Sequence, residues 1–251
     1  MKETRFFYDP QVSGELPQDE AKHATRVLRL AAGDELLLMD GQGSFFRAEI
    51  TVADNHRCLY RILETMPQQP AWEGHIHIAV APTKLNDRME WFAEKATEIG
   101  MDELSFLDCK FSERHVIKCE RIDKIIISAV KQSHKAWKSV LNEMMSFDKF
   151  VRQERKGDKF ICHCYDEGDI EPLSQTLPQT EGLNKPFLMD VLRRGVETTV
   201  LVGPEGDFSV DEVRLALRNG YRSVSLGTSR LRTETAALAA VHMMQIINQK
   251  R

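Results

Sequence analysis

From residue 75 onward, strand-like and helix-like segments alternate along the chain, and this alternation constrains the fold more than any other feature. Short apolar runs predict strands over 75–81, 104–107, 159–164, 199–202 and 223–226. Apolar residues at helical spacing predict helices over 89–99, ending at Gly100, and over 122–130. Such alternation requires right-handed crossovers, so it predicts an α/β fold with a mostly parallel sheet covered by helices on both faces.

The first seventy residues have a different, β-rich pattern. Apolar or alternating runs predict strands over 35–39, 45–52 and 58–63, and one short helix is expected over 19–30. Together these segments predict a small barrel of a few strands. The stretch 66–70 carries two prolines and cannot continue a central strand, so we interpret it as a linker. The expected domains are therefore 1–70 and 71–251, and the Pro-, Gly- and acid-rich stretch 166–186 is expected to be a loop.

Composition favours an ordinary globular protein of the cytoplasm. The chain has 251 residues, 29% of them charged, and a net charge of −4, which excludes a uniformly basic coat but not local basic faces. No apolar run is as long as a membrane span, and the first ten residues lack a secretory signal. Five scattered cysteines suit a reducing compartment. Cys162 and Cys164 have no second pair at zinc spacing, so no metal site is expected.

Two loops that follow predicted strands hold the residues of greatest interest, because ligands of parallel α/β sheets bind beyond the carboxyl ends of the strands. The first loop is Gly203-Pro204-Glu205-Gly206-Asp207-Phe208-Ser209. Its glycines permit tight turns and close approach of a ligand. Ser209 and Glu212 have capping-box spacing, which predicts a helix from Val210 to about Gly220. On these residues alone, a plain strand–turn–helix connection and a ligand loop have about equal weight.

The second loop follows Gly227 and contains Leu231-Arg232-Thr233-Glu234-Thr235 before a helix expected over 236–247. One threonine suffices for the N-cap of that helix, and Glu234 suits its positive end. The remaining hydroxyl and charged groups exceed what capping requires. These groups lie at the expected N-terminus of the helix, where the helix dipole can also contribute to binding a ligand.

Together the two loops resemble the RsmE family of SPOUT-class methyltransferases. The family pattern at the first loop is Gly-Pro-Glu-Gly-Gly-Phe-Ser. At the second loop it is Leu-Gly, a few residues, and then Leu-Arg-Thr-Glu-Thr-Ala, which Leu226-Gly227 and residues 231–236 match here. The resemblance extends over nearly the whole chain, through residues 5–7, 23, 27–29, 33–34, 40–43, 94–100 and 132–133. Two departures stand out: Asp207 replaces the second glycine of a Gly-Gly pair, and His134-Lys135 replaces Gly-Arg.

The resemblance implies an S-adenosylmethionine-dependent enzyme that methylates N3 of a uridine in small-subunit (16S) ribosomal RNA. It implies a SPOUT-type parallel sheet with a C-terminal trefoil knot, a preceding PUA-like β-barrel domain that binds RNA, and a homodimer. The residues implied to bind the cofactor are Val202, Gly203, Pro204, Glu205, Gly206, Leu226, Gly227, Leu231, Arg232, Thr233, Thr235 and Ala236.

Three side chains in the loops are candidates for catalysis. Arg232 has the fixed donors needed to stabilise a developing uridine anion. Glu234 and Glu205 are the carboxylates that could take the N3 proton, hold Arg232 in place, or serve only as a helix-end group and a loop clamp. The sequence leaves these roles open.

Basic residues that could contact RNA phosphates fall outside the two loops. They are Arg5, Lys22, Arg26, Arg29, Arg114, Lys131, His134, Lys135 and Lys138. Lys22, Arg26 and Arg29 are expected on one side of the first helix, and Lys131, Lys135 and Lys138 on one face of a second. Two other functions are kept open: a SPOUT ribose 2′-O-methyltransferase acting on tRNA or rRNA, and a non-catalytic RNA-binding factor of ribosome assembly.

Overall fold

The computed structural model describes residues 6–54, 57–166, 170 and 185–250. These residues form two compact units. The first contains residues 1–71 together with 126–138, and the second contains 72–125 and 139–251. The second half of helix α3 (Cys119–Gln132) and the turn after it therefore pack with the first unit. Arg5 and most of the predicted loop 166–186 lie outside the described residues.

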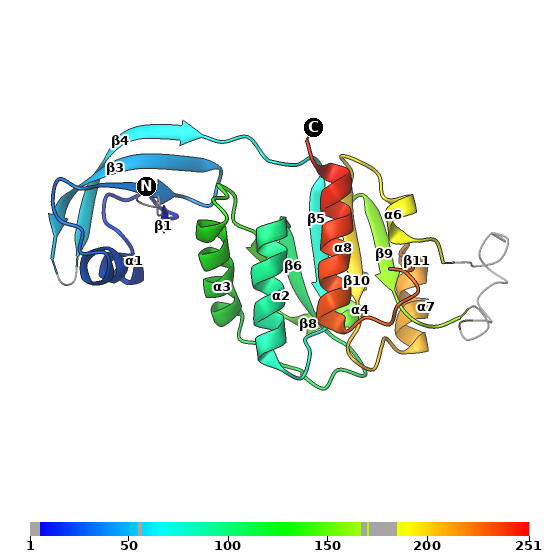
Figure 1. Ribbon diagram of the computed structural model, residues 1–251. Helices are drawn as coiled ribbons and strands as arrows, with labels where there is room; N and C mark the ends of the chain where they lie inside the picture. The colour runs from blue at the N-terminus through cyan, green and yellow to red at the C-terminus, as the bar shows by residue number, and fades with distance from the viewer. Residues whose placement is uncertain (1–5, 55–56, 167–169, 171–184, 251) are drawn as a thin grey trace. The chain divides into compact units, whose positions relative to one another are not determined.

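The first unit is built on a four-stranded sheet in the order β1-β2-β3-β4 (Figure 1). β1 (Phe6–Tyr8) runs parallel to β2 (Glu35–Met39), whereas β2, β3 (Ser44–Ala53) and β4 (Cys58–Pro67) are antiparallel neighbours. Alternate residues of these strands form a buried core with the short helices. The predicted strands are confirmed.

Two sequence predictions for this unit were wrong in their limits. β4 continues through Met66 to Pro67 rather than ending before a linker, because it is an edge strand and its proline need not donate to a further strand. The helix expected over 19–30 is α1 (Gln18–Lys22) followed by a single π-helical stretch, His23–Val27. Arg29, at φ +56°, lies beyond the end of this helix.

The second unit is an α/β domain whose sheet has the order β11-β9-β10-β5-β6-β7, with β8 (Met145–Ser146) beside β6. Every pairing within it is parallel, as predicted. The strands are β5 (His75–Val80), β6 (Glu103–Asp108), β7 (Val140–Leu141), β9 (Asp158–Cys162), β10 (Glu197–Val202) and β11 (Arg222–Val224). The middle strands β5 and β10 are almost entirely buried, which explains the apolar runs at 78–80 and 200–202.

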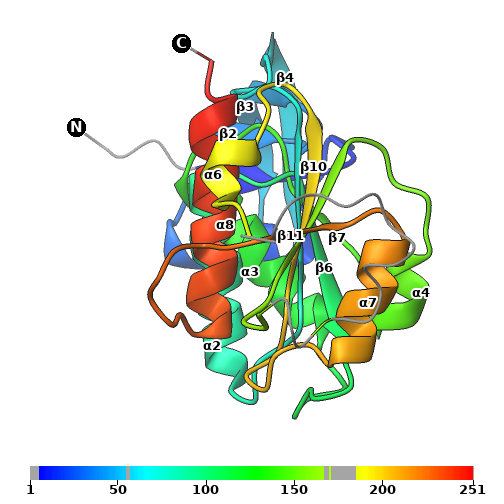
Figure 2. The ribbon, with the colours of Figure 1, turned by 90° about the vertical axis from the view of Figure 1, so that its right-hand side faces the viewer.

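Helices cover both faces of this sheet. Figure 2 shows α2 (Asn86–Ile99), α6 (Leu188–Val191) and α8 (Thr233–Asn248) on one side, and α4 (Phe147–Val151) and α7 (Val210–Arg218) on the other. The buried core beneath α4 and α7 includes Phe147, Phe150 and Phe208. No helix in the described part of the chain is long and apolar enough to cross a membrane.

Candidate functional site

The order of the strands defines one special point at the carboxyl edge of the second sheet. The chain leaves β5 toward β6 on one side, whereas β10 lies on the other side of β5 and is flanked by β9. The loops that follow β5 and β10 therefore diverge at a topological switch point, which is where open α/β sheets bind ligands. The Lys84 amide, four residues after β5, donates to Glu205 Oε1 in the loop after β10 at 2.9 Å. Glu205 thus joins the two loops at the switch point.

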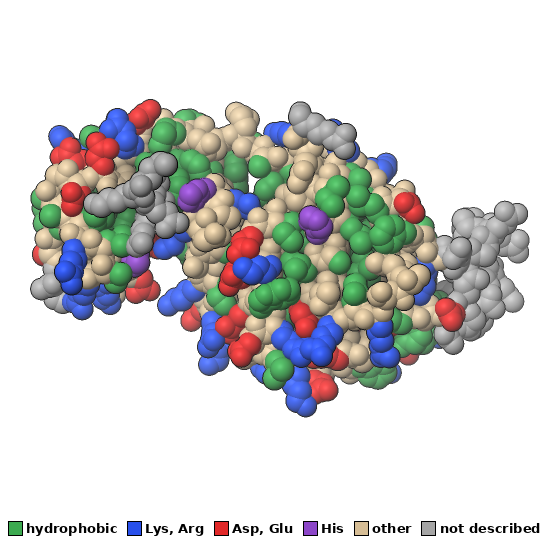
Figure 3. All heavy atoms as spheres, viewed as in Figure 1, with side chains coloured by type: hydrophobic (Ala, Val, Ile, Leu, Met, Phe, Trp, Pro, Cys, Tyr) green, Lys and Arg blue, Asp and Glu red, His purple; other side chains and the backbone are tan. Residues whose placement is uncertain are grey.

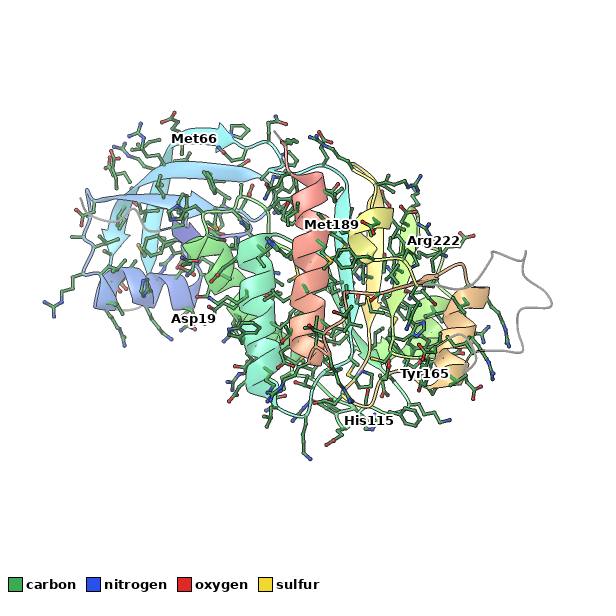
Figure 4. All side chains as sticks on the ribbon, turned by 45° about the vertical axis from the view of Figure 1, so that its right-hand side comes forward. Asp19, Met66, His115, Tyr165, Met189 and Arg222 are labelled. Carbon is green, nitrogen blue, oxygen red and sulfur yellow. The ribbon has the colours of Figure 1, made fainter. Side chains whose placement is uncertain are left out.

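Several other loops end at the same edge. Figure 4 labels His115, which follows β6, and Tyr165, which follows β9, and both lie along the lower end of the sheet. Figure 3 shows Lys and Arg side chains mixed with Asp and Glu at this edge. Lys84 Nζ, for example, pairs with Glu113 at 2.8 Å. The edge is therefore charged but locally neutralised.

The Gly-Pro-Glu-Gly loop packs against the buried Phe208 at its first residue. A Cβ atom on Gly203 would lie 3.1 Å from the ring and the amide nitrogen of the buried Phe208, so a larger residue at this position would crowd Phe208. Val202, Gly203 and Pro204 are buried, whereas Glu205 and Gly206 are exposed. The loop thus presents its second half to solvent.

Asp207 has a role that the family pattern did not suggest. Its backbone is left-handed, with φ +65°, where the family has glycine. Its carboxylate accepts hydrogen bonds from the amides of Phe208 at 2.7 Å and Cys164 at 2.8 Å. Because Cys164 follows β9, Asp207 clamps the loops of two neighbouring strands together. An aspartate tolerates this backbone conformation better than most residues.

Helix α7 begins as the sequence predicted. The Ser209 side chain accepts from the Glu212 amide, and the Glu212 carboxylate accepts from the Ser209 amide at 2.7 Å, which completes a capping box. Glu212 also accepts from the Lys110 amide at 2.8 Å, in the loop after β6.

The beginning of α8 differs from the prediction. The helix starts at Thr233, three residues before the predicted Ala236, and its N-cap is Arg232, which makes no side-chain capping bond. No threonine is the N-cap, because Thr233 and Glu234 are already in the first turn and buried. Arg232 and Thr235 are exposed, as are Gly227 and Leu231. Leu226 and Ala236 are half-buried.

The carboxylate of Glu234 is buried and only half satisfied. The residue is 7% exposed, and its Oε1 accepts from Arg88 Nη1 at 3.0 Å in the first turn of α2. Its other oxygen, Oε2, has no hydrogen-bond partner among the residues that the structure describes. Within the described structure neither Glu234 nor Glu205 bonds to Arg232, which does not favour the alternative that one of them holds this arginine. The Arg232 side chain makes no ion pair or hydrogen bond with a described residue.

Two arginines support the site from outside the two loops. Arg88 was not predicted from the sequence, because its partner lies 146 residues away. Arg114 was predicted to contact RNA, but its guanidinium donates to the carbonyls of Thr83 and Lys84 and so supports the loop after β5.

The two predicted loops lie at the same edge of the sheet, with β9 between their strands. His163 occupies this intermediate position, immediately after β9. Its Nε2 pairs with Ser223 Oγ of β11 at 2.8 Å, and its Nδ1 is buried with no partner from residues 6–54, 57–166, 170 or 185–250. Burial, with a smaller contribution from Lys185, lowers the pKa of His163 to about 4, so the imidazole is neutral at pH 7.

The basic residues of the first unit form the two predicted helical stripes only in part, since Arg29 lies beyond the first helix and Lys135 and Lys138 lie beyond the second. α3 ends at Gln132, so Lys135, Lys138 and His134 are not on that helix. Lys131 forms an ion pair with the buried Glu20 and so serves the fold. His134 takes a left-handed backbone, with φ +51°, where the family has glycine, and this conformation ends the helix. Lys22 is half-buried, and Arg26 and Arg29 are exposed.

A doubly wound parallel sheet with ligand-type loops at its switch point defines the second unit as a ligand-binding α/β domain of the kind found in many enzymes. Comparison with known families identifies this domain further. Residues 70–245 match the model of an RNA methyltransferase domain, and residues 16–63 match that of an RNA methyltransferase PUA domain. The chain belongs to this family of RNA methyltransferases.

Individual relatives resemble nearly the whole chain. The "Ribosomal RNA small subunit methyltransferase E" of Rickettsia conorii is 26% identical over 93% of this chain and 89% of its own length. A "probable rRNA-methyltransferase" from Porphyromonas gingivalis has a structure with TM-score 0.84 and 41% identity, covering 96% of this chain and 98% of that one. The small subunit methyltransferase E of Neisseria gonorrhoeae, solved with S-adenosyl methionine, has TM-score 0.74 and 26% identity, covering 97% and 98%.

Proposed function

We propose that this protein transfers a methyl group from S-adenosylmethionine to N3 of a uridine in 16S ribosomal RNA. Membership of the RNA methyltransferase family supports the reaction class. The relatives named for the small ribosomal subunit support the substrate, and the relative solved with S-adenosyl methionine supports the cofactor. Within this chain, the observation that carries the proposal is the switch point, where the Gly-Pro-Glu-Gly loop meets the loop after β5 at the edge that also holds the start of α8.

The loop residues fit this cofactor. Gly206 and Gly227 are exposed and leave backbone groups accessible to close approach, and a Cβ on Gly227 would meet no atom within 4 Å. The unpartnered Oε2 of Glu234 offers a buried acceptor. The cofactor contacts that we propose come from Val202, Gly203, Pro204, Glu205, Gly206, Leu226, Gly227, Leu231, Arg232, Thr233, Thr235 and Ala236. The family resemblance further supports a trefoil knot formed by these segments.

When bound, S-adenosylmethionine supplies an electrophilic methyl group. The chain's own residues must hold the uridine in line with it and stabilise the base as the N3 proton leaves. Arg232 is suited to the second task, because it is exposed and its guanidinium donors have no partner in the described structure. Glu234 and Glu205 remain the two candidates for the proton acceptor. Glu205 already accepts from the Lys84 amide, which gives it a structural task as well.

Substitution of Arg232 tests this assignment. Arg232→Ala is expected to fold, to bind the cofactor, and to lower the rate constant of methyl transfer by about 100-fold, the effect typical of one lost stabilising donor. Arg230→Ala removes a neighbouring exposed arginine of the same loop and is the matched control, expected to retain the wild-type rate. Single-turnover methyl transfer with saturating cofactor is the measurement. An Arg232→Ala protein with the wild-type rate would refute the role.

We further propose that the first unit binds the RNA. The match to an RNA methyltransferase PUA domain and the exposure of Arg26 and Arg29 support this role. Affinity for small-subunit particles is then expected to fall as salt rises, because phosphate contacts release counterions. By the same family resemblance we propose a homodimer in the cytoplasm, acting on an assembled small subunit.

The alternative functions differ in product and in cofactor binding. A ribose 2′-O-methyltransferase would make an RNA that resists alkaline cleavage at the modified nucleotide. An RNA methylated at N3 does not resist this cleavage. A non-catalytic assembly factor would not transfer methyl groups, and failure to bind S-adenosylmethionine in calorimetry would favour it. The match of residues 16–63 to an RNA methyltransferase PUA domain and the Leu-Arg-Thr-Glu-Thr loop favour the base-modifying reaction.

A further inference from the structure

The ion pair between Arg88 and Glu234 uses only one of the two oxygens of a buried carboxylate. It joins the first turn of α2 to the first turn of α8, and the two helices pack side by side on one face of the sheet (Figure 2). Only one oxygen of Glu234 is used, since Arg88 Nη1 bonds to Oε1 at 3.0 Å. The second oxygen is buried, lies at the start of α8, and has no partner in the described part of the chain.

A buried carboxylate oxygen without a hydrogen bond is costly, and folded proteins rarely retain one without a reason. Helix capping does not explain it, because among the described residues Oε1 accepts from Arg88 and Oε2 bonds to no first-turn amide of α8. Packing alone does not explain it either, since an apolar residue would fill the same space at lower cost. In the sequence, Glu234 lies between Thr233 and the exposed Thr235, within the segment that we propose binds the ligand.

We propose that Glu234 Oε2 accepts a hydrogen bond from a nitrogen donor of the bound ligand, and that Arg88 is the positioning residue that fixes this carboxylate. The donor is either an amino group of the cofactor, in its methionine or its adenine part, or the N3–H of the target base, and these are the nitrogen donors of the two substrates. This inference rests on the proposed function. Arg88 itself touches Glu234 and acts through it. It is half-buried, so its charge is partly desolvated and its geometry well defined.

Helix α2 also forms a second ion pair with an arginine, and the loss of that pair serves as a control. Arg121 of α3 pairs with Glu90 of α2 at 2.6 Å, and its side chain is 65% exposed. Glu90 is not left with a buried, unpartnered atom. Arg121→Ala therefore removes an ion pair from α2 without affecting Glu234.

The experiment compares Glu234→Gln, Arg88→Met, Arg88→Lys and Arg121→Ala by calorimetric cofactor binding and by single-turnover methyl transfer. Glu234→Gln keeps the shape of the side chain, so it is expected to fold. It is expected to lower either the cofactor affinity or the transfer rate at saturating cofactor by about 100-fold, the effect typical of a misplaced group at a site. A loss of affinity identifies the cofactor amino group as the donor, and a loss of rate alone identifies the base.

Arg88→Met is expected to reproduce the deficit of Glu234→Gln in the same quantity, and Arg88→Lys to recover part of it, because lysine restores the charge but not the planar geometry. Arg121→Ala is expected to match the wild type in both. If Glu234→Gln folds and matches the wild type in affinity and rate, the inference is wrong. It is also wrong if Arg88→Met lowers only the thermal stability. An inactive wild-type protein that binds the cofactor would instead refute the proposed function, while the affinity comparison would still test Glu234.

Discussion

Asp207 and His134 offer a paired test of how this chain departs from its family. Both occupy positions where the family has glycine, and both have left-handed backbones, at φ +65° and +51°. Replacing either by glycine relieves strain of roughly 1 kcal/mol but costs about 0.4–1 kcal/mol through the greater freedom of the unfolded chain, so these two effects nearly cancel. The difference between the two variants therefore comes from side-chain contacts.

Asp207→Gly loses two hydrogen bonds from backbone amides to a carboxylate. Each contributes about 1.5 kcal/mol when the acceptor is only half-buried, so the free energy of unfolding should fall by about 3 kcal/mol. His134→Gly loses a ring contact with Phe6, whose centroid is 5.0 Å away, and should change stability by less than about 1 kcal/mol. Asp207→Asn keeps an acceptor for Phe208 but places an NH₂ group toward the Cys164 amide, so it should fall between the two.

Urea unfolding measures the stabilities, and hydrogen exchange at the Cys164 amide reports the clamp directly. Exchange there should accelerate by at least about tenfold in Asp207→Gly and stay unchanged in His134→Gly. If Asp207→Gly is as stable as the wild type and its Cys164 amide remains protected, the carboxylate is not a clamp and the reasoning fails.

Two further predictions concern buried polar groups. Burial lowers the pKa of His163 from 6.5 to about 4, so as the pH falls the unfolded chain binds a proton before the folded chain does. The free energy of unfolding is therefore highest above pH 6.5 and should fall by about 3 kcal/mol as the pH falls toward 4. His163→Gln should flatten that part of a pH series of urea unfolding curves, and an unchanged slope would contradict the assignment. Tyr60 donates to Asp9, a 2% exposed carboxylate, at 2.5 Å; Tyr60→Phe should lower the stability of the first unit by about 2 kcal/mol in thermal unfolding, and an unchanged transition would show that the bond contributes nothing.

Most of the strands could be predicted from the sequence because their side chains are buried in regular patterns. β5 and β10 are buried strands that end in apolar runs, and their limits match the predictions within two residues. The start of α7 was also predictable, because a capping box is a local signal with a fixed spacing. The start of α8 was not, because its N-cap is Arg232, a residue type without capping preference.

The contacts that define the candidate site were beyond sequence reasoning. Arg88 and Glu234 are far apart in the chain, and only the packing of α2 against α8 brings them together. Lys131 looked like part of a solvated basic stripe, yet it pairs with Glu20 across the first unit. A charged residue that neutralises a buried partner has the same local pattern as one that awaits a ligand, so the fold must be known before the two can be distinguished.

The central claim is tested most directly by identifying the methylated nucleoside. Small-subunit particles that lack the modification are incubated with the protein and S-adenosylmethionine labelled in its methyl group, and the ribosomal RNA is then digested to nucleosides and separated. The account predicts that the label elutes with N3-methyluridine for the wild-type protein and is nearly lost for Arg232→Ala. Label on a ribose oxygen, or no incorporation by a wild-type protein shown to be folded, would contradict it.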